Sequence, residues 1–409
     1  MSEHDRRDSP GGASPGAAQL QGASPPRKPG AIRLIDRLDA TNAVILPALA
    51  IVSALVVGAF IIAVTDQDRL KKGDLGGILA TIKSAYWALP QGAFGSWAGL
   101  SETIVSTTPL LLAGLSVAVA FRSGLFNIGA TGQMFAGGMA SVWVGFSMHG
   151  PGLVQIPLAL LAGIIGGGVW GAIVGVLKAR TGAHEVITTI MTNYIAGLLT
   201  LWMLKTKAFQ QPGKDNPISK QVDRHGRLPK LFGFLHRPEL RAHVGFLIAI
   251  AAAAFVWWLF RKSKIGFELR TLGANADAAR YAGMNPATLT IVAMGLAGAF
   301  AGLAGATQIL GTQGYATESF AGGIGFDAIA VALLGRSTPV GTAFAALLFG
   351  VLDAGGRTMQ LKTDVPLDIV LVLRALVVLF IAAPALTKMI WRIRAEGSGT
   401  GLTFRGWGG

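Results

Sequence analysis

Long apolar stretches separated by short polar ones dominate the hydrophobic pattern of this 409-residue chain. A membrane-spanning helix needs about 20 consecutive, mostly apolar residues. The pattern predicts about ten transmembrane or re-entrant helices: 43–64, 98–121, 125–148, 152–177, 185–204, 244–260, 288–310, 326–336, 338–353 and 366–386. The segments 326–336 and 338–353 are short, so whether they fully cross the membrane stays open. The predicted fold is all-α, a polytopic membrane helix bundle.

Ten crossings would place both termini on one side of the membrane. Lys and Arg favour cytoplasmic loops, whereas long loops cross regardless of their charge. With the long loop 205–243 set aside, Lys and Arg favour a cytoplasmic N-terminus. We therefore expect cytoplasmic termini and an outer loop 205–243 that is irregular with short helical turns; a miscounted span before this loop is the alternative. The weakly apolar segment 75–91 predicts an interfacial helix on the outer face.

The two ends of the chain differ in composition from the apolar part. Residues 1–30 are rich in Ser, Pro, Gly and Ala, which predicts a disordered cytoplasmic tail and an uncleaved first span. Residues 31–390 form the predicted transmembrane domain. Residues 391–409 form a basic, glycine-rich cytoplasmic tail.

Composition supports a membrane protein. The chain is 52% hydrophobic and only 14% charged, whereas soluble domains carry about 25% charged residues. Its net charge of +14 is scattered between apolar segments, which indicates charge at membrane edges and argues against a nucleic-acid partner. The absence of cysteine excludes disulfides and thiolate metal sites.

A polar, basic segment at 261–287 lies between two strongly apolar stretches. Apolar residues recur along one face of a short predicted helix: Leu269, Leu272, Ala276 and Ala279. Pro286 ends the pattern, because proline has no N–H to donate. A short amphipathic helix here suits docking of a soluble partner, although a connecting loop on the lipid headgroups has the same pattern.

Two polar clusters occur at the starts of predicted spans. The first contains Asn127, Thr131 and Gln133, and the second contains Thr188, Thr192 and Asn193. Uncompensated polar groups are costly in hydrocarbon, so both clusters must face protein, water or a solute. We interpret them as candidates for the substrate path, with hydrogen bonding between helices as the alternative.

Single residues in the second cluster and in the apolar segments carry further expectations. His184 and Glu185 lack a second histidine at the spacing of a zinc site, so metal binding is not expected, and Glu185 suits a helix N-terminus. The run Gly166–Gly171 has the spacing of a dinucleotide loop, but it lies in an apolar segment and indicates close helix packing. Arg374 needs an acidic partner, for which Asp353 and Asp368 are candidates.

Nucleotide and catalytic motifs are missing. The sequence contains no G-x-x-x-x-G-K-[ST], so this chain does not itself hold ATP phosphates. It also contains no recognisable Ser/His/Asp or Cys/His arrangement. We expect neither enzymatic activity nor a cofactor.

Four runs, in this order, resemble one family: GLFNIGATGQMFAGG, HEVITTIMTNYIA, GFELRTLGANADAARYAGMN and GFDAIAVALLGRSTPVGT. The chain is similar to permease subunits of ABC importers of the branched-chain amino acid/ribose type, in the nucleoside and simple-sugar branch. The similarity covers roughly residues 40–390. It implies a multi-pass protein of the bacterial inner membrane. It also implies three protein partners: a separate ATPase, a second permease in a homo- or heterodimer, and a solute-binding lipoprotein or periplasmic protein.

The resemblance also assigns residues. The ATPase-coupling segment would contain Glu268, Arg270, Gly273, Asn275, Ala279, Arg280, Gly283 and Asn285. Asn127, Gln133 and Asp327 match polar positions of the family runs and join the substrate-path candidates. Thr271 and Met284 depart mildly from the family pattern.

Other functions remain open on the sequence alone. An ion-coupled secondary transporter needs a charged site at the midplane, which Asp327 and Arg374 could supply. A permease for ribose-like sugars or branched-chain amino acids would carry similar polar amides. A membrane scaffold protein without transport is a third possibility.

Overall fold

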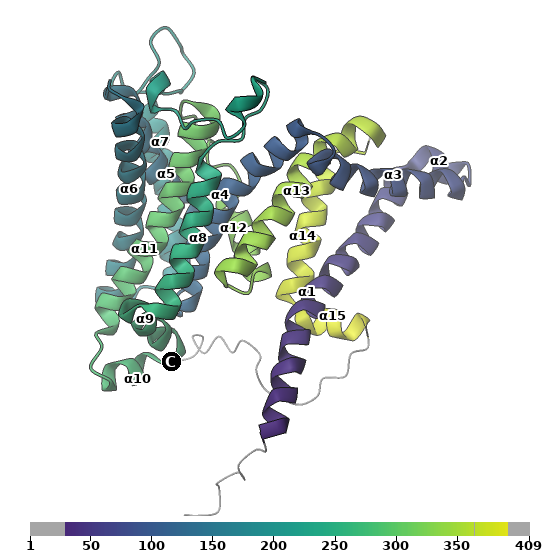
Figure 1. Ribbon diagram of the computed structural model, residues 1–409, viewed down its shortest axis with the longest axis horizontal. Coiled ribbons are helices and arrows are strands. Elements are labelled where there is room, and N and C mark those ends of the chain that lie inside the picture. Colours follow the sequence, from purple (N-terminus) through teal and green to yellow (C-terminus); the bar gives the residue numbers. More distant parts are fainter. Residues whose placement is uncertain (1–28, 364, 392–409) are drawn as a thin grey trace, which may run out of the picture. The chain divides into compact units, whose positions relative to one another are not determined.

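The computed structural model describes residues 29–363 and 365–391, and every regular element in them is helical (Figure 1). The first helices are α1 (Pro29–Thr65), α2 (Gln67–Lys71), α3 (Leu75–Phe94), α4 (Trp97–Arg122), α5 (Ala130–Ser147), α6 (Gly152–Thr181) and α7 (Glu185–Leu204). After a long loop, 205–244, come α8 (Gly245–Lys262), α9 (Lys264–Ala274), α10 (Ala276–Tyr281) and α11 (Pro286–Thr307). The last are η3 (Gln308–Gln313), α12 (Ile324–Leu334), α13 (Pro339–Thr363), α14 (Asp368–Ala382) and α15 (Pro384–Ile390).

The chain divides into two compact units within α1, one ending at Ala48 and the other beginning at Leu49. The described part of the first unit is the helical stretch 29–48. The predicted tails 1–30 and 391–409 lie outside the described residues, except for residues 29, 30 and 391.

Seven helices of the described residues are long and apolar enough to cross a membrane. They comprise Ala48–Thr65 of α1, α4, α6, α7, α8, α11 with η3, and α13. A polytopic all-α membrane protein is therefore confirmed, whereas the ten crossings and the cytoplasmic termini stay predictions. The long loop contains two short 3₁₀ turns, Arg224–Gly226 and Gly233–Leu235, as its proline content predicts.

Three predicted spans differ from the observed helices. The segment 125–148 begins with a non-helical stretch, 124–129, so that α5 covers only 130–147. The segment 366–386 is broken before Pro384 into α14 and α15, because proline cannot donate to the preceding turn. The segment 338–353 continues to Thr363, which makes α13 a 25-residue helix that is long enough to cross.

Helix α4 is the centre of the main hydrophobic core. It is apolar on all sides, and 83% of its apolar window is buried, as expected for a helix surrounded by others. Helices α8, α11, α12 and α13 pack against it. The ends of α4 therefore set the positions of groups contributed by several neighbouring elements.

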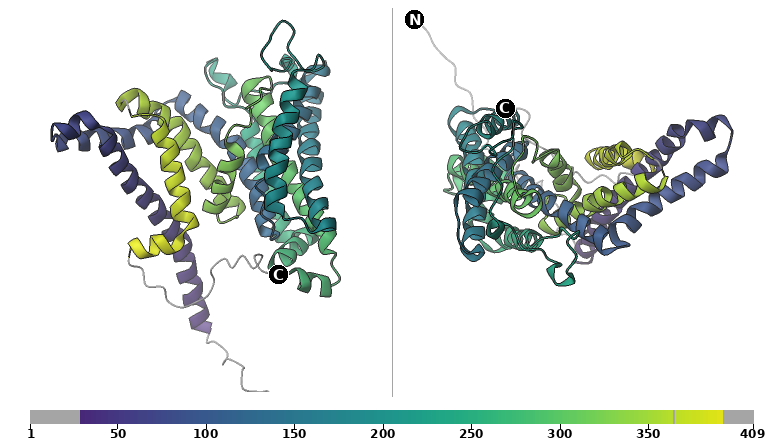
Figure 2. Two further views of the ribbon diagram at one scale, coloured as in Figure 1. Left: turned by 180° about the vertical axis from the view of Figure 1, so that it is seen from behind. Right: turned by 90° about the horizontal axis from the view of Figure 1, so that it is seen from above.

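Helices α6 and α11 lie side by side in both views (Figure 1, Figure 2). Their contact is made by glycines, because a Cβ on Gly167 would collide with the carbonyl oxygen of Gly298. The glycine run at 166–171 is thus a helix-packing surface, as its apolar surroundings predict.

Candidate functional site

A π-helical turn, Gln308–Gln313, follows α11 directly. Such i→i+5 turns are rare and are frequent at functional sites. The turn is held in place by His243 of the long loop, whose imidazole lies where a Cβ of Gly311 would be and whose Nε2 is 3.3 Å from the Thr312 hydroxyl. Because a π-helical turn is wider than an α-helical one, Thr312 and Gln313, which follow Gln308 by four and five positions, lie on either side of Gln308. All three residues face the same space.

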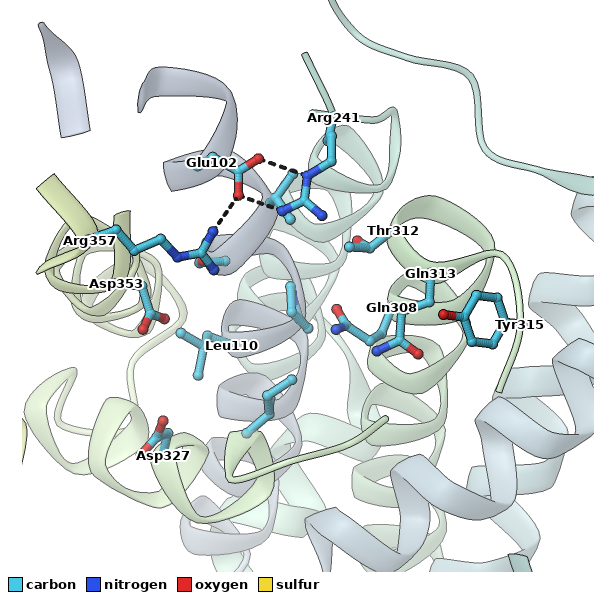
Figure 3. A pocket seen from close by; sticks show the side chains of 14 residues that line it. Glu102, Leu110, Arg241, Gln308, Thr312, Gln313, Tyr315, Asp327, Asp353 and Arg357 are labelled. Carbon is cyan, nitrogen blue, oxygen red and sulfur yellow. Dashed lines mark hydrogen bonds and ion pairs between the residues drawn. The ribbon is translucent and has the colours of Figure 1, made fainter. Parts of the chain in front are cut away.

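That space is a cavity of about 440 Å³, within the range of small-molecule sites. Figure 3 shows its lining, which comes from α4, the long loop, η3, Tyr315, α12 and α13. The polar and charged lining residues are Glu102, Ser106, Arg241, Gln308, Thr312, Gln313, Tyr315, Asp327, Asp353 and Arg357. Segments far apart in the sequence therefore meet around one polar cavity.

Glu102 of α4 joins two other elements across one end of the cavity (Figure 3). Arg241 of the long loop donates two hydrogen bonds to it, at 2.8 and 2.6 Å, and Arg357 of α13 donates one at 3.1 Å. The hydrogen bond to Glu102 raises the pKa of Arg241 above its ordinary value. These three residues form a clamp, named here the Glu102 clamp, between α4, α13 and the long loop.

A second ion-pair cluster lies at another part of the wall. Arg374 of α14 is buried, with 9% of its side chain exposed, and contacts Asp327 and Asp353. Its Nη1 lies 3.2 Å from Oδ2 of Asp327, and its Nη2 pairs with Oδ1 of Asp353. The expected partner Asp353 is confirmed, and Asp327 is a second one that compensates the buried guanidinium.

The long loop is hydrogen-bonded to the cavity wall at several points. The amides of Val222 and Leu228 donate to the carbonyl oxygens of Gly314 and Leu310, at 2.8 and 2.9 Å. The amide of Ser219 donates to the carbonyl oxygen of Ala316 at 2.9 Å. The loop and the π-helical turn therefore form one packed structure, and a displacement of the loop would move the cavity wall.

Most of the substrate-path candidates lie away from this cavity. Asn127 and Gln133 are buried, at 0% and 1% exposure, and they hydrogen-bond to each other at 3.0 Å. Asn127 also accepts from the amide of Gly129 at 2.9 Å. This network closes the non-helical stretch 124–129 onto the start of α5. Asn127 also donates to the hydroxyl of Ser116 in α4 at 3.4 Å, a contact of the kind that the sequence left open as hydrogen bonding between helices.

The α7 candidates have similar local partners. Asn193 donates to the carbonyl oxygen of Ile128 at 2.9 Å and accepts from the amide of Gly132 at 2.7 Å, so it ties α7 to the same stretch. Thr188 and Thr192 donate to the carbonyl oxygens of Glu185 and Thr189 in their own helix. The buried hydroxyl of Thr131 has no partner among the described residues. Of the seven candidates, only Asp327 lines the cavity.

The segment 261–287 contains two short helices and not one. Asn275 divides them, because its extended backbone ends α9 while its side chain accepts from the amides of Asp277 and Ala278 in α10. Leu269, Leu272 and Ala279 are buried as the apolar stripe predicts, but Ala276 is exposed.

The coupling candidates divide into exposed and structural residues. Arg270 and Arg280 are exposed, and Glu268 lies 3.7 Å from Lys264 across one turn. Asn285 caps α11, and Gly283 has a φ of 81° that favours glycine. Ala279 is buried, and Gly273 packs against the Arg122–Gly124 backbone so closely that any side chain would collide with it. The end of α9 therefore rests on the stretch that leads into α5.

Several residues of these surfaces escaped sequence reasoning. Gln308, Gln313 and Tyr315 follow a long apolar run, which was a readable signal for polar groups at the end of a span. Arg241 and Arg357 could not be joined to Glu102 from sequence, since more than a hundred residues separate each from it. Tyr281, 93% exposed beside the coupling candidates, lies in the quoted run but carried no assignment.

Comparisons with known proteins agree with this architecture. A family model described as "Branched-chain amino acid transport system / permease component" matches residues 99–382. The guanosine ABC transporter permease of Bacillus subtilis is 39% identical over 87% of this chain and 97% of its own length. The glucose ABC transporter permease of Haloferax volcanii is 35% identical over 82% and 86%, and the nucleoside ABC transporter permease NupB of Lactococcus lactis is 34% identical over 86% and 93%. No solved structure matches the chain.

Proposed function

Because the chain belongs to the branched-chain amino acid transport system / permease component family, we propose that it is the membrane-spanning subunit of an ABC importer for nucleosides. It is a multi-pass protein of the inner membrane. Its task is to provide a route for a polar solute, while a separate ATPase supplies the energy.

The nucleoside assignment is supported by two similar proteins, which are named as guanosine and nucleoside permeases. A glucose permease at 35% identity keeps simple sugars as the alternative. The cavity adds a physical argument. Three carboxylates (Glu102, Asp327 and Asp353) are balanced by three guanidinium groups (Arg241, Arg357 and Arg374), so it suits an uncharged polar solute.

A partner ATPase follows from the sequence and from α9 and α10. The chain carries no phosphate-binding loop, and its exposed residues Arg270, Arg280 and Tyr281 lie on a short two-helix segment. We propose that this segment, 261–287, is cytoplasmic and receives the ATPase. Closure of the ATPase would push α9, and the contact of Gly273 with Gly124 would carry the movement to α5.

The remaining partners are proposed from the other end of the helices. The long loop and the segment 65–97 would lie outside and receive a solute-binding lipoprotein or periplasmic protein. A second permease, identical or similar, would complete the path. Membrane lipids would cover the remaining apolar faces.

The observation that carries the proposal is the pairing of a charge-balanced cavity with an exposed amphipathic segment next to the opposite end of α4. The competing ion-coupled transporter would use Asp327 and Arg374, but these two residues are ion-paired with each other, and Arg374 also pairs with Asp353. That arrangement favours a structural or recognition role over proton uptake.

Uptake of radiolabelled guanosine tests the proposal in cells that express this permease together with its partner ATPase, second permease and binding protein. We expect uptake to require the ATPase and to persist when a protonophore removes the ion gradient while ATP is maintained. Uptake without the ATPase that collapses with the protonophore would overturn the proposal in favour of ion coupling. Uptake of glucose but not of guanosine would show that the transported solute is a sugar and not a nucleoside.

A further inference from the structure

The cavity has two chemically different walls (Figure 3). Asp327 and Asp353 lie on one side, whereas Gln308, Gln313 and Tyr315 lie on the other. The first side therefore offers carboxylate acceptors, with the guanidinium of Arg357 beside Asp353, and the other side offers amide groups and an aromatic ring.

The acidic wall keeps free hydrogen-bonding capacity. Arg374 contacts Oδ2 of Asp327 and Oδ1 of Asp353, and no other hydrogen-bond donor to either carboxylate is found among the described residues. Each aspartate side chain is 34% exposed, so both carboxylates remain accessible from the cavity that they line. Two neighbouring acceptors on α12 and α13 suit two neighbouring hydroxyl donors, such as a vicinal diol.

The amide wall is also unsatisfied. The side chains of Gln308, Gln313 and Tyr315 make no hydrogen bond within the part of the chain that the structure describes, and Oε1 of Gln313 is buried without a partner. A buried acceptor without a partner costs free energy until a donor reaches it. A carboxamide can pair with the donor and acceptor edge of a nucleobase, and an aromatic ring can stack on the base.

The charges of the two ion-pair clusters limit the ligand further. The three carboxylates and three guanidinium groups around the cavity cancel, so no net positive charge is left to attract a phosphate. A phosphate would also approach Asp327 and Asp353, where like charges repel. The cavity therefore favours a nucleoside over a nucleotide.

We propose that this cavity is a built nucleoside subsite in which the two ends of the ligand are recognised separately. Asp327 and Asp353 accept hydrogen bonds from the 2′- and 3′-hydroxyls of the ribose. Gln308 and Gln313 pair with the edge of the base, and Tyr315 stacks on its face. The inference rests on the proposed nucleoside function and adds that the permease itself selects the solute.

The test compares uptake ratios in permease variants that share one ATPase and one binding protein. Because those partners stay constant, a change in ratio reports on the permease alone, and a ratio does not depend on how much protein folds. The sugar ratio is guanosine uptake over 2′,3′-dideoxyguanosine uptake. The base ratio is guanosine uptake over purine riboside uptake, since purine riboside lacks the exocyclic groups of guanine.

We expect Asp327→Asn and Asp353→Asn to lower the sugar ratio by about tenfold, the effect of losing a hydrogen bond to a charged group, and to leave the base ratio unchanged. Gln308→Leu and Gln313→Leu should lower the base ratio and leave the sugar ratio unchanged. Asp368→Asn, on α14 outside the cavity lining, is the matched control and should change neither ratio.

Two outcomes overturn the subsite. One is that wild-type uptake is driven by ATP, but all four cavity variants have the same sugar and base ratios as the wild type. The other is an equal fall of both ratios in every variant, which would show that the two walls do not recognise separate parts of the ligand. If the aspartate variants fail to reach the membrane, the glutamine variants decide, because they leave the ion pairs intact. Failure of the wild-type protein to import guanosine with its ATPase would instead refute the proposed function.

Discussion

Asn275 is a single residue that ends one helix and begins another. Its side-chain oxygen accepts from the amides of Asp277 and Ala278 at 2.9 and 3.1 Å. These amides would otherwise lack a partner, because the first turn of a helix has no preceding carbonyl groups. The first turn of α10 therefore depends on one side-chain amide, within the segment proposed to meet the ATPase.

Loss of this cap should weaken the segment measurably. We expect Asn275→Ala to destabilise α10 by about 1 kcal/mol and to increase amide exchange in residues 276–281. Asn275→Asp keeps an acceptor and should retain wild-type exchange. The measurement is hydrogen–deuterium exchange of the purified protein, and equal exchange in the alanine variant and the wild type would contradict the assigned role.

His243 is the residue whose protonation should affect stability most clearly. Burial lowers its pKa to about 4, and its Nδ1 accepts from the amide of Gly245 at 3.2 Å, which requires a neutral ring. An unfolded histidine has a pKa of about 6.5, so the unfolded state binds more protons between pH 6.5 and 4. The contribution of neutral His243 to the free energy of unfolding is therefore fully present above pH 6.5. It is lost as the pH falls towards 4, by about 3 kcal/mol in total.

Thermal unfolding of the wild type and His243→Gln at pH 7.5 and pH 5 checks this prediction. The melting temperature of the wild type should fall more between pH 7.5 and pH 5 than the melting temperature of the variant. A drop of the same size in both proteins would show that other groups cause the pH dependence.

At the scale of elements, periodicity and apolar length predicted those helices whose ends are set locally. The bounds of α7 were predicted at both ends, since Glu185 follows a polar turn and the apolar run ends at Leu204. The π-helical turn could not be predicted, because it depends on His243, which is 69 residues away from Thr312. The broken segment 366–386 was missed because the pattern stayed apolar through Pro384.

The same reasoning applies to the candidate site. The cost of burying Arg374 predicted an acidic partner, Asp353 or Asp368; the structure has Asp353 and, as a second partner that was not predicted, Asp327. Polar residues at span starts were assigned to the path, and that assignment stays a prediction; in the structure Asn127 and Gln133 bond to each other. A sequence shows that a buried amide needs a partner, but it does not show whether that partner is a side chain or a solute.

The coupling segment offers an element-scale prediction. Arg270 is exposed and has no ion pair among the described residues, so reversing its charge should impair docking without affecting the fold. We expect Arg270→Glu to reduce the amount of ATPase that co-purifies with the permease. Arg237→Glu, an exposed arginine of the long loop, is the matched control. Equal ATPase recovery from both variants would argue against docking at α9. Gly273 is a poorer choice, because any side chain there would disturb packing.

At the scale of the whole molecule, the Glu102 clamp connects the long loop to α4 and α13 beside the cavity. The long loop also holds the π-helical turn through His243 and several backbone hydrogen bonds. Binding of a partner to this loop would therefore act on the cavity from two sides. We predict that the clamp opens when solute enters, because Glu102, Arg241 and Arg357 lie across one end of the cavity.

The absence of cysteine makes the clamp testable. In the double variant Glu102→Cys/Arg241→Cys, a short thiol-specific cross-linker that is cleavable by reductant should stop guanosine uptake, and reductant should restore it. Each single cysteine variant, treated in the same way, should keep its own untreated rate. Full uptake by the cross-linked double variant would mean that the clamp stays closed during transport.

The account as a whole requires α9 and α10 to face the cytoplasm, where an ATPase can reach them. The most direct test is labelling of Arg270→Cys with a membrane-impermeant maleimide, using Lys214→Cys in the long loop as the opposite reference. We predict that Arg270→Cys is labelled in inside-out vesicles and protected in intact spheroplasts, and that Lys214→Cys shows the reverse. Labelling of Arg270→Cys in intact spheroplasts would contradict the account, because energy from ATP could not then enter through this segment.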